Sequence, residues 1–171
     1  MNDALANMLG ALSIAVMDRI EAVAREILGR AGEAPAALVV IGYGEGITND
    51  RLRRILGLSH SGAVRLVDRL VSDGLVERRK GRDGREIALH LTIIGAETRS
   101  QILAGRLQTI GTMLGPLTSG ELDRLAVLIR RLLAAQTTSE QDRYTICRLC
   151  DASVCTHCPL PTKKGAQTDA T

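Results

Sequence analysis

Apolar residues recur at three- and four-residue steps through the first thirty residues of the chain. This period is typical of one long amphipathic helix, which the glycines at positions 29 and 32 are expected to end. The apolar stripe consists of Leu5, Met8, Leu9, Leu12, Val16, Ile20, Val23 and Ile27. Pro35 then stands where the first turn of a second helix would begin. This second helix should run to about Ile41, and its uniformly apolar residues predict that it is buried.

Two short helices are predicted next. Positions 47–48 fit a very short strand, and Asn49 is the expected N-cap of the first helix, which Gly57 should end. Ser59 is the expected cap of the second helix, which should span 59–73. The inner faces of the two helices consist of Leu52, Ile55 and Leu56, and of Ala63, Leu66, Val67 and Leu70.

A polar hairpin follows the two short helices. A strand is expected at 75–79 and a return strand at 85–91, with Ile87, Leu89 and Leu91 alternating toward the interior. The tip between them contains Asp83-Gly84, a strong turn signal. The sequence therefore predicts a small antiparallel β-hairpin.

The helical period returns after Thr92. A long helix is expected to end at Gly115-Pro116, and Thr118 with Glu121 forms a capping box for the last helix. The residues that mark the long helix are Ile102, Leu103, Leu107, Ile110 and Leu114, and those that the last helix should bury are Leu122, Leu125, Ile129, Leu132 and Leu133. From Thr137 onward the pattern is lost, and the tail is expected to be disordered beyond about Pro161.

Positive charge is concentrated in the segment 49–92. This segment holds ten basic and six acidic residues, a net charge of +4, so the rest of the chain carries −1. Such a concentration is expected of a surface that contacts nucleic acid. The chain has only two Tyr and no Phe or Trp, which argues against single-stranded nucleic acid, because stacking platforms need aromatic rings.

The second short helix is the expected reader of double-stranded DNA. When it is projected at 100° per residue, Arg65 and Arg69 lie opposite its apolar face. Arg65 is the expected base reader, since its guanidinium can bond guanine O6 and N7 together, and Arg69 should reach a phosphate. The residues expected to contact DNA are His60, Ser61, Gly62, Val64, Arg65 and Arg69 on the helix, with Arg82 and Arg85 on the hairpin.

The segments 58–70 and 73–78 resemble the recognition-helix pattern of MarR-type transcriptional regulators. Asp83-Gly84-Arg85 and the segment 91–95 resemble the wing of that family and its exit from the wing. The resemblance implies a homodimer on successive major grooves, regulated by a small ligand or by thiol oxidation. It also implies that Asp83 shapes the wing. Gly62 and Val64 depart from the Ser or Thr that many members carry there.

The predicted fold is therefore mainly α with a small β-hairpin wing, a winged helix-turn-helix with long dimerisation helices. One domain is expected at 1–136, with its DNA-binding part at 47–92 and dimerisation helices at 4–30 and 93–136. A cysteine-containing tail follows at 137–171. A homodimer is expected because the apolar stripes of the long helices would otherwise remain partly exposed.

Four cysteines form a cluster in the tail. They are spaced as two C-x2-C pairs, Cys147, Cys150, Cys155 and Cys158. Four thiolates suit one tetrahedral zinc ion, the last three also resemble part of an iron–sulfur run, and a reversible dithiol switch is the third interpretation. All three remain open on sequence grounds.

These observations favour a sequence-specific regulator that binds double-stranded DNA, a repressor modulated by ligand, metal or thiol redox state. A winged-helix module for protein interaction is the alternative. No catalytic constellation is evident, so an enzyme is not expected. No apolar run is long enough for a membrane span, and the N-terminus lacks the positive start of a signal peptide, so we expect a cytoplasmic protein.

Overall fold

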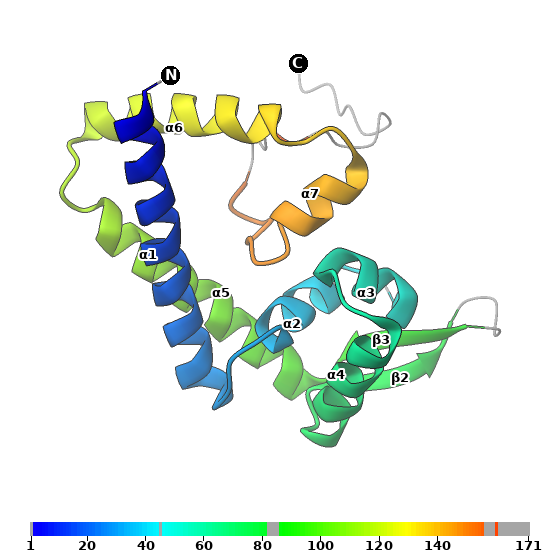
Figure 1. Ribbon diagram of the computed structural model, residues 1–171. Helices are drawn as coiled ribbons and strands as arrows, with labels where there is room; N and C mark the ends of the chain where they lie inside the picture. The colour runs from blue at the N-terminus through cyan, green and yellow to red at the C-terminus, as the bar shows by residue number, and fades with distance from the viewer. Residues whose placement is uncertain (1, 45, 82–85, 156–159, 161–171) are drawn as a thin grey trace, which may run out of the picture.

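The computed structural model describes residues 2–44, 46–81, 86–155 and 160. Two long helices, α1 (Asp3–Leu28) and α5 (Ile93–Leu114), lie side by side, and a compact unit of short helices and a small sheet sits at one end of them (Figure 1). A third long helix, α6 (Ser119–Ala135), crosses at the other end. The expected fold class, mainly helical with a small hairpin wing, is confirmed.

The compact unit is built around the buried helix α2 (Ala34–Tyr43), whose residues 34–41 are all buried. Around it lie α3 (Asn49–Leu56), α4 (His60–Ser72) and a three-stranded sheet. The buried side chains with almost no exposed surface include Leu38, Ile41, Leu52, Ile55, Val67, Leu70 and Leu89. Since residues 34–41 of α2 are all apolar, this part of the helix is stable only in a covered position.

The sheet joins the hairpin to the short strand that precedes α3. Its order is β1 (Ile47–Thr48), β3 (Ile87–Leu91), β2 (Val76–Lys80), and both pairings are antiparallel. Ile47 pairs with Leu89 in β3, so the segment before α3 is held by the same strand that forms the wing. The predicted hairpin is confirmed, but Ile87 is not inward-facing: it is 59% exposed, because the hairpin extends beyond the core.

Backbone caps define the turn between α3 and α4. Gly57 ends α3 in the left-handed conformation, with φ of 67°, and the Ser59 side chain accepts a hydrogen bond from the Gly62 N–H at 3.1 Å. The expected cap of α3 was wrong by one residue. Thr48 is the N-cap, its Oγ1 accepting from the Arg51 N–H, and Asn49 is the first helical residue.

The junction between the compact unit and α5 is held by Thr92. Its N–H donates to the Leu75 carbonyl at 3.1 Å, and its hydroxyl donates to the Gly74 carbonyl at 2.6 Å. The same hydroxyl oxygen accepts from the Gly95 N–H. A Cβ at position 95 would lie 1.9 Å from the Leu75 carbonyl oxygen, so only glycine allows this close approach.

Two expectations for the C-terminal third differ from the structure of the single chain: the burial of residues by the last long helix, and the loss of helical pattern from Thr137 onward. Helix α6 buries none of its residues, and Ile129 and Leu132 are 43% and 53% exposed. The helical pattern is not lost at Thr137 either. Ser139 and Asp142 form a capping box for a further helix, α7 (Glu140–Ile146), which is too short to show periodicity. The expectation of disorder beyond Pro161 lies outside the described residues.

Among the described residues no helix is both long enough and apolar enough to span a membrane.

Candidate nucleic-acid interface

Helix α4 presents one polar face to solvent at the edge of the compact unit. Its inner residues Ala63, Val67 and Leu70 are fully buried. Outward-facing positions carry the residues that the sequence singled out: His60, Ser61, Arg65 and Arg69 are exposed, whereas Gly62 and Val64 are half-buried. The structure therefore brings the predicted helix residues together on one surface, with its N-terminal turn accessible. Gly62 also has a local role, because a Cβ there would lie 3.0 Å from the Ser59 Oγ that caps the helix.

Ion pairs neutralise several of the cations in the basic segment. Asp50 pairs with Arg53 and Arg54 within α3, and the hydrogen bond from Arg53 holds the pKa of Asp50 below its ordinary value. Arg79 pairs with Glu77 on β2. These three arginines and two acids lie on the surface, so their ion pairs cost little free energy to break, but the pairing reduces the net positive field of the segment.

A further ion pair ties α4 to the wing. The Arg78 guanidinium on β2 lies 2.5 Å from the Asp68 carboxylate on α4. In the described part of the chain Arg65, Arg69 and the exposed Lys80 have no carboxylate partner. The described cations of the basic segment without a carboxylate partner are therefore on the outer face of α4, at the end of β2, and on α3, where Arg51 lies over the ring of Tyr144. The wing-tip residues Arg82, Asp83 and Arg85 lie outside the described residues.

A second group of candidate residues lies in the turn after α7. Cys147 is the C-cap of α7, and the Cys150 N–H donates to the Cys147 carbonyl at 2.9 Å, so the two cysteines bracket a tight turn. The Cys147 thiol hydrogen-bonds the Cys150 sulfur, which lowers the pKa of Cys150 to about 6 against the opposing effect of burial, and Arg106 contributes to the lowering. Cys155 is exposed, and Cys158 lies outside the described residues.

We expect Cys150 to be the most readily alkylated thiol near neutral pH, because the thiolate is the nucleophile. Its rate of reaction with iodoacetamide should reach half its maximum near pH 6. This rate is measured by peptide mass spectrometry of samples alkylated across a pH series. Cys147→Ala removes the hydrogen bond that lowers the pKa of Cys150 and should move this midpoint upward. A midpoint that already lies at the ordinary thiol value in the unmodified protein would contradict the expectation.

The described residues do not assemble a metal site of three or more His, Cys, Asp or Glu groups. The zinc and iron–sulfur interpretations require Cys158, which lies outside those residues, and so they remain untested. The Cys147–Cys150 pair is the part of the cluster for which the structure provides a geometry.

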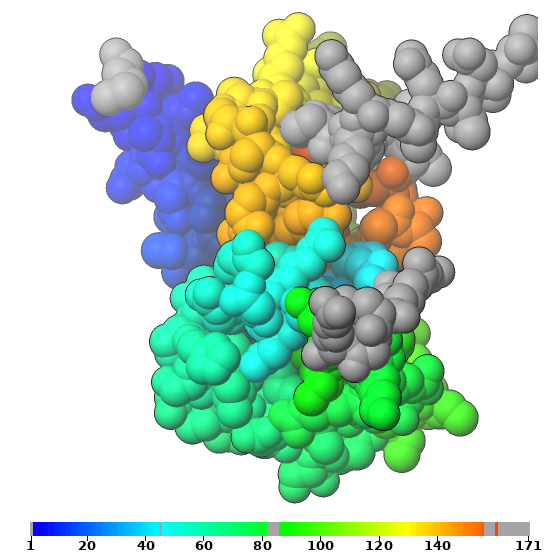
Figure 2. Space-filling view, turned by 90° about the vertical axis from the view of Figure 1, so that its right-hand side faces the viewer, coloured from blue at the N-terminus to red at the C-terminus, as the bar shows by residue number. Residues whose placement is uncertain are grey.

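Sequence reasoning missed that the segment after α6 packs against the compact unit. Figure 2 shows α7 seated directly on α3. The Arg51 guanidinium lies 4.8 Å from the ring centroid of Tyr144 on α7, and that of Arg99 lies 4.7 Å from the Tyr43 ring. Tyr43 and Tyr144 are the only aromatic residues in the chain. Their scarcity was the available signal that each has a specific partner.

The fold and the exposed basic face of α4 together define a winged helix-turn-helix protein. Residues 29–86 match the model of the MarR family, and among curated proteins there is no significant match. The chain therefore has a winged helix-turn-helix fold like that of MarR-family transcriptional regulators, and its residues 29–86 are similar in sequence to that family.

Several solved structures share this fold over most of the chain. Apo MarR from E. coli is 26% identical, with a TM-score of 0.59 over 73% of this chain and 96% of that chain. RV1404 from Mycobacterium tuberculosis is 21% identical, with a TM-score of 0.67 over 77% of this chain and 92% of that chain. MepR, a transcription regulator of the Staphylococcus aureus multidrug efflux pump MepA, is 14% identical, with a TM-score of 0.65 over 79% of this chain and 98% of that chain.

Proposed function

We propose that this protein binds double-stranded DNA sequence-specifically, with α4 in the major groove, and represses transcription. The observation that carries the proposal is the outer face of α4, where Arg65 and Arg69 are exposed and have no carboxylate partner among the described residues. The major groove of B-DNA accepts an α-helix and displays a distinct pattern of donors and acceptors for each base pair. The alternative, a protein-interaction module, is disfavoured because a docking face would be more apolar at its centre.

The proposed binding unit is a homodimer. The apolar side chains exposed on α1 and α6 of one chain would be costly to leave in water as contiguous patches. They include Leu5, Met8, Leu9 and Leu12 on α1, and Val127, Leu128, Ile129 and Leu132 on α6. A second copy covering these faces would place two α4 helices on one side of the assembly. The expected target is then an inverted repeat with half-sites about one helical turn apart.

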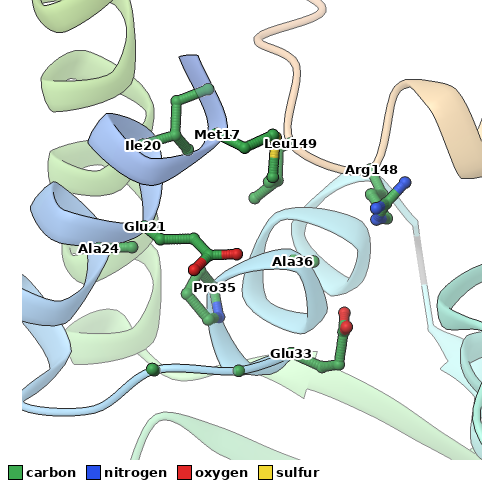
Figure 3. Close-up of a pocket in the computed structure, with 11 residues that line it drawn as sticks. Met17, Ile20, Glu21, Ala24, Glu33, Pro35, Ala36, Arg148 and Leu149 are labelled. Atoms are coloured by element: carbon green, nitrogen blue, oxygen red, sulfur yellow. The ribbon is translucent and has the colours of Figure 1, made fainter. Parts of the chain in front are cut away.

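Regulation is proposed to act where the compact unit meets the long helices. A small effector would bind there, or the tail cysteines would change state there. A cavity of about 70 Å³ lies at this junction between α1, the start of α2 and the turn at 148–149 (Figure 3). Its walls include Met17 and Ile20 on one side and Pro35 on the other. This cavity is small, so an effector larger than a few atoms would have to displace Leu149 from its wall.

The test of base reading is Arg65→Ala. Loss of a bidentate contact should cost about 1–3 kcal/mol on the preferred site and relax discrimination at one base pair per half-site. The preferred site would be selected from random duplexes, and affinity would then be measured by fluorescence anisotropy on that site and on a scrambled duplex.

Arg69→Ala is the matched control on the same helix. Because a phosphate contact carries no sequence information, this variant should lose similar affinity on both duplexes and show a smaller salt dependence. Equal losses for Arg65→Ala on the selected and scrambled duplexes would show that Arg65 does not read bases. Failure of the unmodified protein to enrich any sequence would overturn sequence-specific binding itself.

A further inference from the structure

The compact unit meets the long helices along one side. Helix α5 packs on α2 and on β3, and the last turn of α1 contacts the same buried core. Helix α6, whose exposed apolar face belongs to the proposed dimer, lies at the far end of α1 and α5 (Figure 1). A body held along one side can still rotate about that side, so this junction alone does not fix the orientation of α4.

A second attachment comes from the segment 137–152, which we call the strap. It begins at the end of α6, where the buried Thr137 donates its hydroxyl hydrogen to the Leu133 carbonyl at 3.0 Å. The strap then crosses to the compact unit as α7, which lies on α3 (Figure 2). It lies outside residues 29–86, the part of the chain that matches the MarR family model, so that match assigns it no role.

The first anchor of the strap is the contact between α7 and α3. The Gln141 side-chain amide donates to the Arg54 carbonyl at 3.1 Å, and the Arg51 guanidinium lies 4.8 Å from the ring centroid of Tyr144. Tyr144 also packs against the buried core of the compact unit. Helix α3 packs directly against α4. The strap therefore holds the helix that braces the proposed DNA-reading helix.

The second anchor of the strap lies beyond α7. Leu149 packs against the same core, and it lines the cavity between α1 and α2 together with Met17 of α1 (Figure 3). The Ala152 N–H donates to the Tyr43 hydroxyl at 3.0 Å, and the Tyr43 ring is itself covered by the Arg99 guanidinium of α5. The strap thus connects the end of α6 to α3 and to the end of α2. Two anchors on different elements oppose rotation of the compact unit about its junction with α5.

We propose that the strap holds the compact unit at one angle to the long helices, and that Gln141, Tyr144 and Tyr43 thereby determine which half-site spacing the dimer accepts. Successive base pairs advance about 3.4 Å along the DNA, so a longer or shorter inverted repeat requires the two α4 helices to move relative to each other. With the strap docked, that movement would break its contacts with α3 and Tyr43. The inference rests on the proposed function, because spacing matters only to a dimer that reads two half-sites.

The first experiment tests docking of the strap without DNA, by hydrogen exchange of the full-length protein. The double variant Gln141→Ala/Tyr144→Ala should lose protection in 140–146, while the buried helix 34–41 stays protected. Tyr144→Phe keeps the ring over Arg51, and Val154→Ala changes a tail residue that is 57% exposed. Both should exchange like the unmodified protein. If residues 140–146 of the unmodified protein already exchange as fast as those of the double variant, the strap is not docked and the proposal fails.

The second experiment measures affinity for inverted repeats of the selected half-sites, with the spacing changed by one or two base pairs in either direction. The unmodified protein should prefer one spacing. In the double variant this preference should fall at least about fivefold, the lower end of the usual coupling between sites. Tyr43→Phe removes only the hydroxyl of the second anchor and should reduce the preference in the same direction, whereas Tyr144→Phe and Val154→Ala should keep it. Because the preference is a ratio of affinities, a uniform change caused by freeing Arg51 cancels.

Three results would overturn the role of the strap in spacing. Lost protection in 140–146 with an unchanged spacing preference is the first. The second is a change of affinity that is equal at every spacing: a gain would mean that the strap covers the surface that meets DNA, and a loss that it only supports α3. The third is an unmodified protein that selects half-sites but accepts every spacing equally, which leaves the proposed function standing. If the unmodified protein selects no sequence, the proposed function itself fails, while the first experiment still decides whether the strap is docked.

Discussion

Replacing Ile129 with aspartate is expected to separate the protein into folded monomers that no longer bind an inverted repeat. Ile129 is 43% exposed in one chain, and α6 has no buried residue, so the carboxylate does not disturb the fold of the protomer. In the proposed dimer the same position would be covered by the partner, and an unpaired carboxylate would enter an apolar interface. A penalty of about 3 kcal/mol or more raises the dimer Kd by more than 100-fold.

Sedimentation velocity at micromolar concentration measures the dimer, and anisotropy on the inverted repeat measures binding. Circular dichroism should remain that of the unmodified protein. Ser119→Asp is the matched control, because it places the same carboxylate at the exposed start of the same helix, where negative charge is tolerated. It should remain dimeric. A dimeric Ile129→Asp protein, or an unmodified protein that is a stable monomer and binds DNA normally, would contradict the proposed assembly.

Gly95→Ala is expected to destabilise the protein by about 3 kcal/mol, at the upper end of the usual cost of overpacking. The new Cβ would lie 1.9 Å from the Leu75 carbonyl oxygen, a backbone atom that cannot rotate away. The start of α5 must then move, which disturbs the hydrogen bonds of Thr92 to Leu75 and Gly74. Because these bonds join the compact unit to α5, we also expect weaker binding to the inverted repeat.

Urea unfolding at a fixed protein concentration gives the change in free energy of unfolding. Gly111→Ala, on the same helix, is the control, since a Cβ there meets nothing within 4 Å. This variant should be stabilised by up to about 1 kcal/mol through helix propensity. If Gly95→Ala were as stable as Gly111→Ala, the close approach at Leu75 would not constrain the junction.

The helix-turn-helix and its wing could be predicted from local patterns. The three- and four-residue spacing of apolar residues placed α1, α3, α4 and α5, and Gly57 and Ser59 located the turn between α3 and α4. Such signals act over one or two turns of helix, so they are readable without knowing the fold. Helix α7 was not predicted because its two turns are too short to show a periodic pattern of apolar residues. Ser139 and Asp142 form a capping box that could have indicated its start.

The sequence by itself determined which residues lie on the outer face of α4, because helical geometry places Arg65 and Arg69 opposite Ala63 and Val67 whatever surrounds them. It could not determine which arginines of the basic segment remain unpaired. That depends on contacts such as the one between Arg78 on β2 and Asp68 on α4, which the pairing of separate elements creates.

Tertiary structure alone decided the place of the cysteine turn. Gln141 meets Arg54 across 87 positions of the sequence, and Ala152 meets Tyr43 across 109. No periodicity encodes contacts over such separations, because they form only once α2, α3 and the long helices have assembled into a surface that the tail can cover. Cysteine spacing alone left both metal binding and thiol chemistry open, with metal binding favoured, whereas docking of the tail placed Cys150 near Arg106.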